Sequence, residues 1–380
     1  MKKIPILSLT LIILFSLIGC NSSNETTETI DSTNSPTPTI STEVTDKPNN
    51  SSDESYLSDE YELPDPSTAE TLTVYLTNFD DEISTKFYND TGYKVEIVTC
   101  TSQEIQTLIS DETNTTVWDV LLIDSLSSMY QLNQNEELFA NWVPQNIGNI
   151  LDKYLELIPD NCSYYPICSY ATGVIVYNAN TYTALTAPQS YDDLLDESSG
   201  YTIGFANASM DYSAYSLVSY LFNKYSDDND LFGGYDYFNE LIDEGAMSYP
   251  SNEKVIEYLE TGRINIALLP ETLAFSLTNS NPIFKMIYPE NGTAATVQVA
   301  GISASSQNTA VAKLFIEYLL ESDTQQELIQ NSNSFFYEVC IDDVIETNQR
   351  RLYTINLEYT DPQWSAINEE EILYWFDYII

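Results

Sequence analysis

From Leu72 onward, short β-rich runs alternate with segments of helical periodicity, and this order restricts the fold more than any other feature of the chain. The β-rich runs cover residues 72–76, 94–98, 117–123, 173–177, 202–205 and 264–269. Helical patterns lie between them and after them, over 102–110, over 212–225 and from Asn308 onward. The run VWDVLLI at 117–123 is typical of a strand buried on both faces. The alternation predicts an α/β fold with mostly parallel sheets and helices on both faces.

The first twenty residues have the pattern of an export signal. Met1-Lys2-Lys3 precedes an apolar run at 4–18, which is shorter than the roughly 20 residues that cross a bilayer. The run ends in Leu17-Ile18-Gly19-Cys20, which resembles the lipobox of bacterial lipoproteins. This resemblance implies that Cys20 becomes the first residue and carries a lipid. The alternative is an ordinary cleaved signal (residues 1–20) with an incidental cysteine.

Residues 21–70 consist mainly of Ser, Thr, Asn, Pro, Asp and Glu. Such a segment buries too little apolar surface to offset the entropy of ordering, so we expect it to be disordered. A flexible coil of about 50 residues spans roughly 40 Å. Because the segment follows Cys20 directly, a tether explains its position better than a tail without a role.

The formal net charge is −45 and histidine is absent. This charge repels nucleic-acid phosphates and anionic lipid surfaces, so we expect no nucleic-acid partner and no membrane contact except through the anchor. The segment beyond the tether, about 310 residues, is long enough for two domains with separate cores.

Cys20 is assigned to the anchor, and four further cysteines, Cys100, Cys162, Cys168 and Cys340, remain in the exported part. Disulfides are permitted there. A Cys162–Cys168 bridge, a Cys100–Cys340 bridge and buried thiols all stay open. The sequence has no histidine, Cys-x-x-Cys pair, Gly-x-Ser-x-Gly elbow or P-loop, so we predict no zinc site, no cofactor and no enzyme activity.

Six segments, in order, resemble the periplasmic-type solute-binding proteins of the ferric-ion, phosphonate, thiamine and polyamine group. They are FYNDTGYKVEIV, VWDVLLIDSLSSMYQL, GVIVYNANTY, SNEKVIEYLETGRINIALL, SQNTAVAKLFIEYLLESDTQQEL and QWSAINEEEILYWF. The resemblance covers essentially all of residues 71–380. It implies a two-lobe, periplasmic-binding-protein-like fold of type II, in which each lobe is a mixed, mostly parallel sheet flanked by helices.

The implied lobe boundaries are 71–173 plus 298–338 for lobe 1, and 174–297 plus 339–380 for lobe 2. In this family the lobes close on a ligand like a hinged trap. Ligands of open α/β sheets bind beyond the carboxyl ends of the strands. We therefore expect the binding residues in the loops that follow strands.

Two turns of lobe 2 are the main candidates. Asn207-Ala208-Ser209 follows the strand at 202–205, and Ser251-Asn252 begins another helix. The free N–H groups of helix N-termini favour anions. In ferric-binding relatives a serine matched by Ser209 and an asparagine matched by Asn252 contact the anion that accompanies iron. Plain helix capping is the alternative for both turns.

The other candidate loops are Thr77-Asn78-Phe79, Asp124-Ser125 and Glu271-Thr272. Asp124 either accepts a hydrogen bond from the ligand or caps the next helix. Iron-binding relatives have adjacent tyrosines where this chain has Thr272-Leu273, and often a histidine at the position of Phe79. Ferric iron prefers several anionic oxygen ligands, so we predict no direct metal site.

The sequence thus predicts a monomeric, lipid-anchored, extracellular solute-binding component of an ABC importer, with a permease and an ATPase as partners. A small organic solute with an oxyanion group is favoured. Three alternatives stay open. The chain binds a cationic amine caged by Asp124, Glu271 and tyrosine faces, or a ferric complex, or it is a sensory receptor.

Overall fold

The computed structural model describes residues 61–77, 79, 81–110, 117–227, 230–331, 338–341 and 355–380. Cys20, Asn78 and the predicted signal peptide and tether up to residue 60 lie outside the described residues. No helix in the described part combines the length and the apolar character needed to span a bilayer.

Two separate mixed sheets form the framework. In the first, the strand order is β11-β4-β10-β3-β1-β2, and β12 also pairs with β10. Its strands are β1 (Leu72–Leu76), β2 (Val95–Thr99), β3 (Val120–Ile123), β4 (Tyr164–Ala171), β10 (Thr293–Ile302), β11 (Glu338–Val339) and β12 (Leu357–Tyr359). β1 lies parallel to both β2 and β3, whereas β10 is antiparallel to β3 and β4.

The second sheet has the order β7-β6-β8-β5-β9. Its strands are β5 (Val174–Asn178), β6 (Ile203–Ala206), β7 (Met247–Tyr249), β8 (Ile266–Leu269) and β9 (Phe284–Ile287). β6 is parallel to β7 and β8, and β5 is antiparallel to β8 and β9. The predicted parallel pairing therefore holds for the strands joined by helices. The strands that enter from the other sheet are antiparallel to their main neighbours, β5 to β8 and β9, and β10 to β3 and β4.

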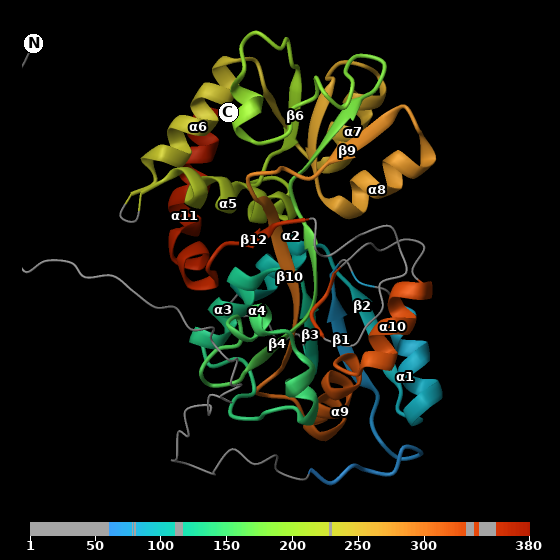
Figure 1. Ribbon diagram of the computed structural model, residues 1–380. Helices are drawn as coiled ribbons and strands as arrows, with labels where there is room; N and C mark the ends of the chain where they lie inside the picture. The colour runs from blue at the N-terminus through green and yellow to red at the C-terminus, as the bar shows by residue number, and fades with distance from the viewer. Residues whose placement is uncertain are drawn as a thin grey trace, which may run out of the picture. The chain divides into compact units, whose positions relative to one another are not determined.

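Helices flank both sheets, as Figure 1 shows. Around the first sheet lie α1 (Ile83–Thr91), α2 (Ser102–Ser110), α3 (Leu126–Gln134), α4 (Asp152–Leu155), α9 (Thr309–Leu319), α10 (Ser322–Asn331) and the 3-10 turn η1 (Gln145–Asn149). Around the second lie α5 (Tyr215–Tyr225), α6 (Phe232–Asp243), α7 (Asn252–Glu260), α8 (Glu271–Ser280), α11 (Pro362–Ile379) and the turns η2 (Asp192–Leu195) and η3 (Tyr212–Ala214). α1 stops at Gly92, whose φ of 82° is left-handed, as the sequence predicts.

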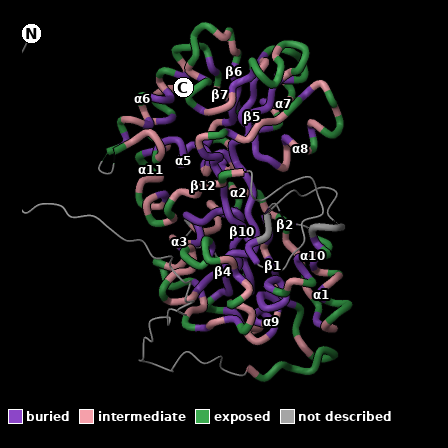
Figure 2. The backbone as a smooth tube through the Cα atoms, in the orientation of Figure 1, coloured by how far each residue is buried: buried purple, intermediate pink, exposed green. Residues whose placement is uncertain are grey.

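Each sheet has its own hydrophobic core, and buried residues follow the strands in Figure 2. In the first core, Phe87 packs edge to face against Phe315 and Tyr318. In the second core, Phe238 contacts Phe205 and Phe376. The predicted two-lobe α/β fold is thus confirmed, because each lobe buries a separate apolar core. The residue boundaries of the lobes stay a prediction.

Within the described residues, three chain segments connect the two cores. Tyr170 of β4 belongs to the first core, and the next residue, Ala171, which ends β4, belongs to the second. β10 starts in the second core at Ala294 and continues in the first from Val297. β12 runs beside β10 in parallel register. These segments are the places where a relative motion of the lobes must bend the backbone.

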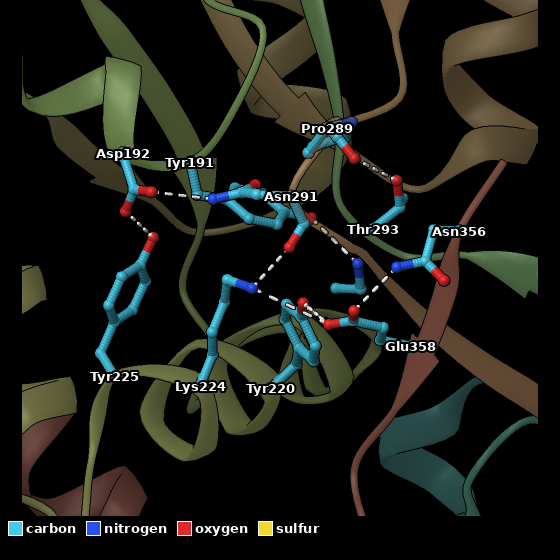
Figure 3. A network of polar contacts seen from close by, with 11 residues as sticks. Tyr191, Asp192, Tyr220, Lys224, Tyr225, Pro289, Asn291, Thr293, Asn356 and Glu358 are labelled. Atoms are coloured by element: carbon cyan, nitrogen blue, oxygen red, sulfur yellow. Dashed lines mark hydrogen bonds and ion pairs between the residues drawn. The ribbon is translucent and has the colours of Figure 1, made fainter. Parts of the chain in front are cut away.

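A polar network surrounds the start of β10 (Figure 3). Glu358 of β12 accepts a hydrogen bond from the hydroxyl of Tyr220, and its Oε2 lies 3.8 Å from Nζ of Lys224. Lys224 also donates to the main-chain oxygen of Asn291 at 2.6 Å. The side chain of Asn291 donates to Asp192 at 2.9 Å. The network ties the crossing segment to α5 and η2.

Candidate functional site

The first carboxylate between the lobes is Asp124, directly after β3. It is 6% exposed. Its Oδ1 accepts a hydrogen bond from the hydroxyl of Thr77 at 2.8 Å, and its Oδ2 accepts one from the hydroxyl of Tyr170. The N–H of Asp124 donates to the same threonine oxygen at 3.0 Å. Two strand ends and the end of β4 therefore fix the orientation of this carboxylate.

A second carboxylate, Glu271, is the first residue of α8 and is fully buried. It accepts hydrogen bonds from the N–H of Ala171 at 2.9 Å and from the hydroxyl of Tyr288. Because Tyr170 and Ala171 are consecutive, the end of β4 holds one carboxylate of each lobe. The predicted candidates Asp124 and Glu271 are thus linked through a crossing segment.

A third carboxylate, Asp211, occupies the helix N-termini of lobe 2. Its Oδ1 accepts hydrogen bonds from the N–H and the hydroxyl of Ser213, at 3.2 and 2.6 Å. Its Oδ2 accepts hydrogen bonds from the N–H and the side-chain amide of Asn252, at 3.1 and 3.2 Å. One carboxylate therefore joins the start of η3, which leads into α5, to the start of α7. The protein itself supplies a negative charge where helix ends favour an anion.

The lobes touch through a tyrosine and two glutamines. Tyr212 of η3 accepts a hydrogen bond from Nε2 of Gln106 at 3.0 Å, and its hydroxyl lies 3.4 Å from that of Ser127 in α3. Glu369 of α11 accepts hydrogen bonds from Gln106 at 2.5 Å and Gln131 at 3.2 Å. α11 also packs into the second core through Ile372 and Phe376. It is therefore attached to both lobes.

Burial raises the pKa values of Glu369 and Tyr212 at this contact. Removal from water raises the pKa of Glu369 above its usual range, although Tyr212, Gln106 and Gln131 partly oppose this by hydrogen bonding to the carboxylate. Burial also raises the pKa of Tyr212 well above that of a free tyrosine, and the charge of Glu369 adds to the rise. Tyr212 is therefore a neutral hydroxyl at neutral pH.

We refer to these groups as the inter-lobe site, which consists of Thr77, Gln106, Asp124, Tyr170, Asp211, Tyr212, Asn252, Glu271, Tyr288 and Glu369. Beside it lies a cavity of about 20 Å³. Its lining includes the hydroxyl groups of Ser127, Ser219 and Thr360. This volume suffices for one water molecule.

The structure places the sequence candidates as follows. Thr77 and Asp124 bond to each other, Ser125 caps α3 by accepting from the N–H of Ser128, and Ser251 caps α7. Asn207 accepts from the N–H groups of Ser209 and Met210, so it closes its own turn. Phe79 and Ala208 are buried in the cores, Ser209 is exposed and Thr272 is partly exposed.

Sequence reasoning did not single out Gln106, Tyr170, Asp211, Tyr212, Tyr288 and Glu369. Of these residues, Asp211 could have been found from the sequence. It stands two residues before Ser213 at the start of a helical pattern, as expected of an N-cap. Tyr170, Tyr288 and Glu369 carried no such signal. Their roles depend on partners 46, 17 and 263 positions away in the sequence.

In the described part of the chain, Cys100, Cys162, Cys168 and Cys340 form no disulfide. The Cys162–Cys168 and Cys100–Cys340 bridges left open by the sequence are thus not present. The described residues also bring together no group of three or more Cys, Asp or Glu side chains that suits a metal ion.

Comparison with known proteins identifies the family. Residues 118–350 match the family model described as bacterial extracellular solute-binding protein. This chain belongs to that family. Membership implies a small-molecule ligand and ABC transporter partners, and the known members of this kind are binding proteins. No curated protein sequence matches the chain.

Solved structures of the same fold cover most of the chain. Iron-bound HitA from Pseudomonas aeruginosa is 18% identical, with a TM-score of 0.67, over 81% of this chain and 99% of HitA. AfuA from Actinobacillus pleuropneumoniae, with fructose-6-phosphate bound, is 17% identical, with a TM-score of 0.68, over 82% of this chain and 99% of AfuA. FutA from Trichodesmium, in complex with iron and citrate, has a TM-score of 0.66 at 16% identity, over 82% of this chain and 99% of FutA. At these identities the similarity concerns the fold.

Proposed function

We propose that this solute-binding protein captures a small organic cation, such as a polyamine-like or thiamine-like amine, between its lobes and delivers it to an ABC permease. The observation that carries the proposal is the Asp211 carboxylate, which accepts four hydrogen bonds at the helix N-termini of lobe 2. A solute oxyanion would have to displace this charge or lie beside it. Displacing the carboxylate and placing a second negative charge beside it both cost electrostatic energy.

The remaining charges of the site also favour a cationic solute. Asp124, Glu271 and Glu369 are carboxylates at or near the contact between the lobes. Lys254, the cation nearest to the predicted anion turn in sequence, donates from Nζ to the carboxylate of Glu257 at 2.7 and 2.8 Å. Tyrosine faces and carboxylates together attract ammonium groups. This favours the amine, one of the alternatives from the sequence, over the oxyanion that the sequence favours.

An oxyanion-bearing solute is the second candidate, because AfuA, of the same fold, has fructose-6-phosphate bound. Ferric complexes are a third, because HitA and FutA carry iron in their structures. The binding experiment below includes all three classes.

The purified full chain in mild detergent should bind one organic cation without altering it. At a free ligand concentration of about one hundred times Kd, the free energy of unfolding should rise by about 2.7 kcal/mol. A thermal-shift screen of diamines, thiamine, sugar phosphates, phosphonates and ferric citrate, followed by calorimetric titration of the hits, measures this effect. Stabilisation by the anions or by ferric citrate alone would refute the cation proposal and leave the solute-binding assignment intact.

For the ligand found, Asp124→Asn should weaken binding about tenfold, because the amide keeps the size of the carboxylate and removes its charge. Asp65→Asn is the matched control, since that carboxylate is exposed and bonds to Ser67. Equal affinities of the two variants would remove Asp124 from the inter-lobe site.

We further infer that the chain is held at the outer face of the cell membrane by a lipid on Cys20, as the lipobox-like sequence before this residue indicates. The full chain expressed in a bacterium should then partition into the detergent phase, and Cys20→Ser should move it to the aqueous phase. Ala substitution of Cys162, a cysteine far along the chain, is the control. A wild-type chain found in the aqueous phase would contradict the anchor.

A further inference from the structure

A groove between α6 and α11 lies outside the inter-lobe site. Its volume is about 420 Å³. Four aromatic side chains, Phe232, Tyr235, Trp364 and Trp375, line it together with Asp230 and Glu371. Figure 1 shows α11 running beside α6, and both helices pack on the second core. The volume is in the range of small-molecule sites.

The spacing of residues on α11 places the groove at the edge of the second core, against which Trp364 and Trp375 are partly packed. Trp364, Glu371 and Trp375 are seven and four positions apart, so they share one face of the helix. Ile372 and Phe376, one position further on, face the second core and are fully buried. Phe232 and Tyr235, three positions apart on α6, face Trp375 from the other side. Helical periodicity therefore dedicates one face of α11 to packing and another to the groove.

The rings stand around the groove instead of stacking on one another. The centroids of Tyr235 and Trp375 are 5.4 Å apart with planes at 74°, and those of Phe232 and Trp375 are 6.5 Å apart at 47°. Nε1 of Trp375 donates to Oε1 of Glu371 at 3.2 Å. This bond holds a carboxylate beside the indole. Phe232 is 63% exposed at the rim, so its ring is accessible to a ligand in the groove.

The charges of the groove select the ligand. Within the described residues that line it, the charged side chains are Asp230 and Glu371, and lysine and arginine are absent. Aromatic faces carry negative quadrupole charge and attract cations, most of all when a carboxylate stands nearby. The side-chain amide of Asn368, also in the lining, already donates to the main-chain oxygen of Trp364 at 2.8 Å. The two carboxylates therefore repel phosphate or carboxylate ligands.

We propose that the α6–α11 groove is a second binding site, which takes the alkylammonium group of a small molecule. The methyl or methylene groups lie against Trp375, Tyr235 and Phe232, and the positive charge faces Glu371 and Asp230. The site is distinct from the inter-lobe site, since the two share no residue. Its existence does not depend on which solute is transported.

Choline and its neutral isostere 3,3-dimethylbutan-1-ol are the probes, added to the purified full chain. Calorimetry and tryptophan fluorescence should show choline binding, with the isostere about tenfold weaker because it lacks the charge. Glu371→Gln should weaken choline binding about tenfold, and Trp375→Ala at least as much. Glu370→Gln is the matched control, because it removes the same charge one residue away on α11 without lining the groove.

Three results would overturn the proposal. They are equal binding of choline and the isostere, equal affinity of the Glu371→Gln and Glu370→Gln variants, and displacement of choline by the solute that binds between the lobes. The third result would place choline in the inter-lobe site, whereas failure of that site to bind any cation would leave the groove experiment unaffected. Glu371→Gln alters a single exposed side chain. The choline affinity of this variant can therefore be interpreted even if Trp375→Ala does not fold.

Discussion

Replacing Gly292 by alanine should lower the free energy of unfolding by about 3 kcal/mol. Gly292 lies between β9 and β10 with a φ of 105°, a region in which a side chain costs about 1–3 kcal/mol. A Cβ atom there would also collide with the carboxylate of Glu358. That carboxylate is held by Tyr220 and Asn356 and lies near Lys224 (Figure 3), so moving it aside breaks charge-assisted hydrogen bonds.

Urea unfolding measures this effect. Gly148→Ala is the matched control, because nothing lies within 4 Å of a Cβ at that exposed glycine, and we expect a change within about 0.5 kcal/mol. The double variant Gly292→Ala, Glu358→Ala separates the two causes, since it removes the collision and keeps the backbone strain. A Gly292→Ala protein as stable as the Gly148→Ala protein would show that the crossing segment is not confined as described.

Replacing Asp211 by alanine should lower the free energy of unfolding by about 2 kcal/mol and create a binding site for inorganic anions. The variant loses an N-cap, and the N–H groups of Ser213 and Asn252 lose their acceptor. Asn252 is 3% exposed, so water replaces the carboxylate poorly. The vacant position lies between two helix N-termini, which favour an anion.

Sulfate should therefore raise the stability of the Asp211→Ala variant more than that of a control variant. At about ten times Kd, binding returns about 1.4 kcal/mol, which for a chain of this length corresponds to about 2–4 °C in Tm. The matched control is Asp361→Ala, which removes the carboxylate that accepts from the N–H of Trp364 at the start of α11. General salt effects act on both variants alike. Equal sulfate responses would mean that Asp211 fills no anion position, and the argument for a cationic solute would lose its basis.

Most of the fold was predictable from the sequence. The strand at 72–76, the helix at 102–110 and the stop at Gly92 agree with the structure, because each depends on neighbours along the chain. The strand predicted at 117–123 starts only at Val120, where its pairing with β1 begins. β4 and β10 were not singled out. Both are buried along their whole length, so they lack the alternation that marks a half-exposed strand.

The candidate site was predictable only in part. The strand-end rule selected Thr77, Asp124 and Glu271, and the structure ties Thr77 to Asp124 directly. The rule did not reveal that Tyr170 and Ala171 join Asp124 to Glu271. The resemblance to ferric-binding relatives implied that Asn252 contacts a ligand anion, whereas its side chain donates to Asp211, 41 positions away.

The sequence alone determined what depends on local pattern, namely the alternation of strands and helices, the cap at Ser251 and the acidic charge. Local pattern suffices there because propensity, capping and periodicity act over a few residues. Only the tertiary structure decided which charge stands at the helix N-termini and what Glu369 contacts. Such pairings depend on how distant segments meet across two cores, and the free energy of a buried carboxylate is set by the partners that it finds there.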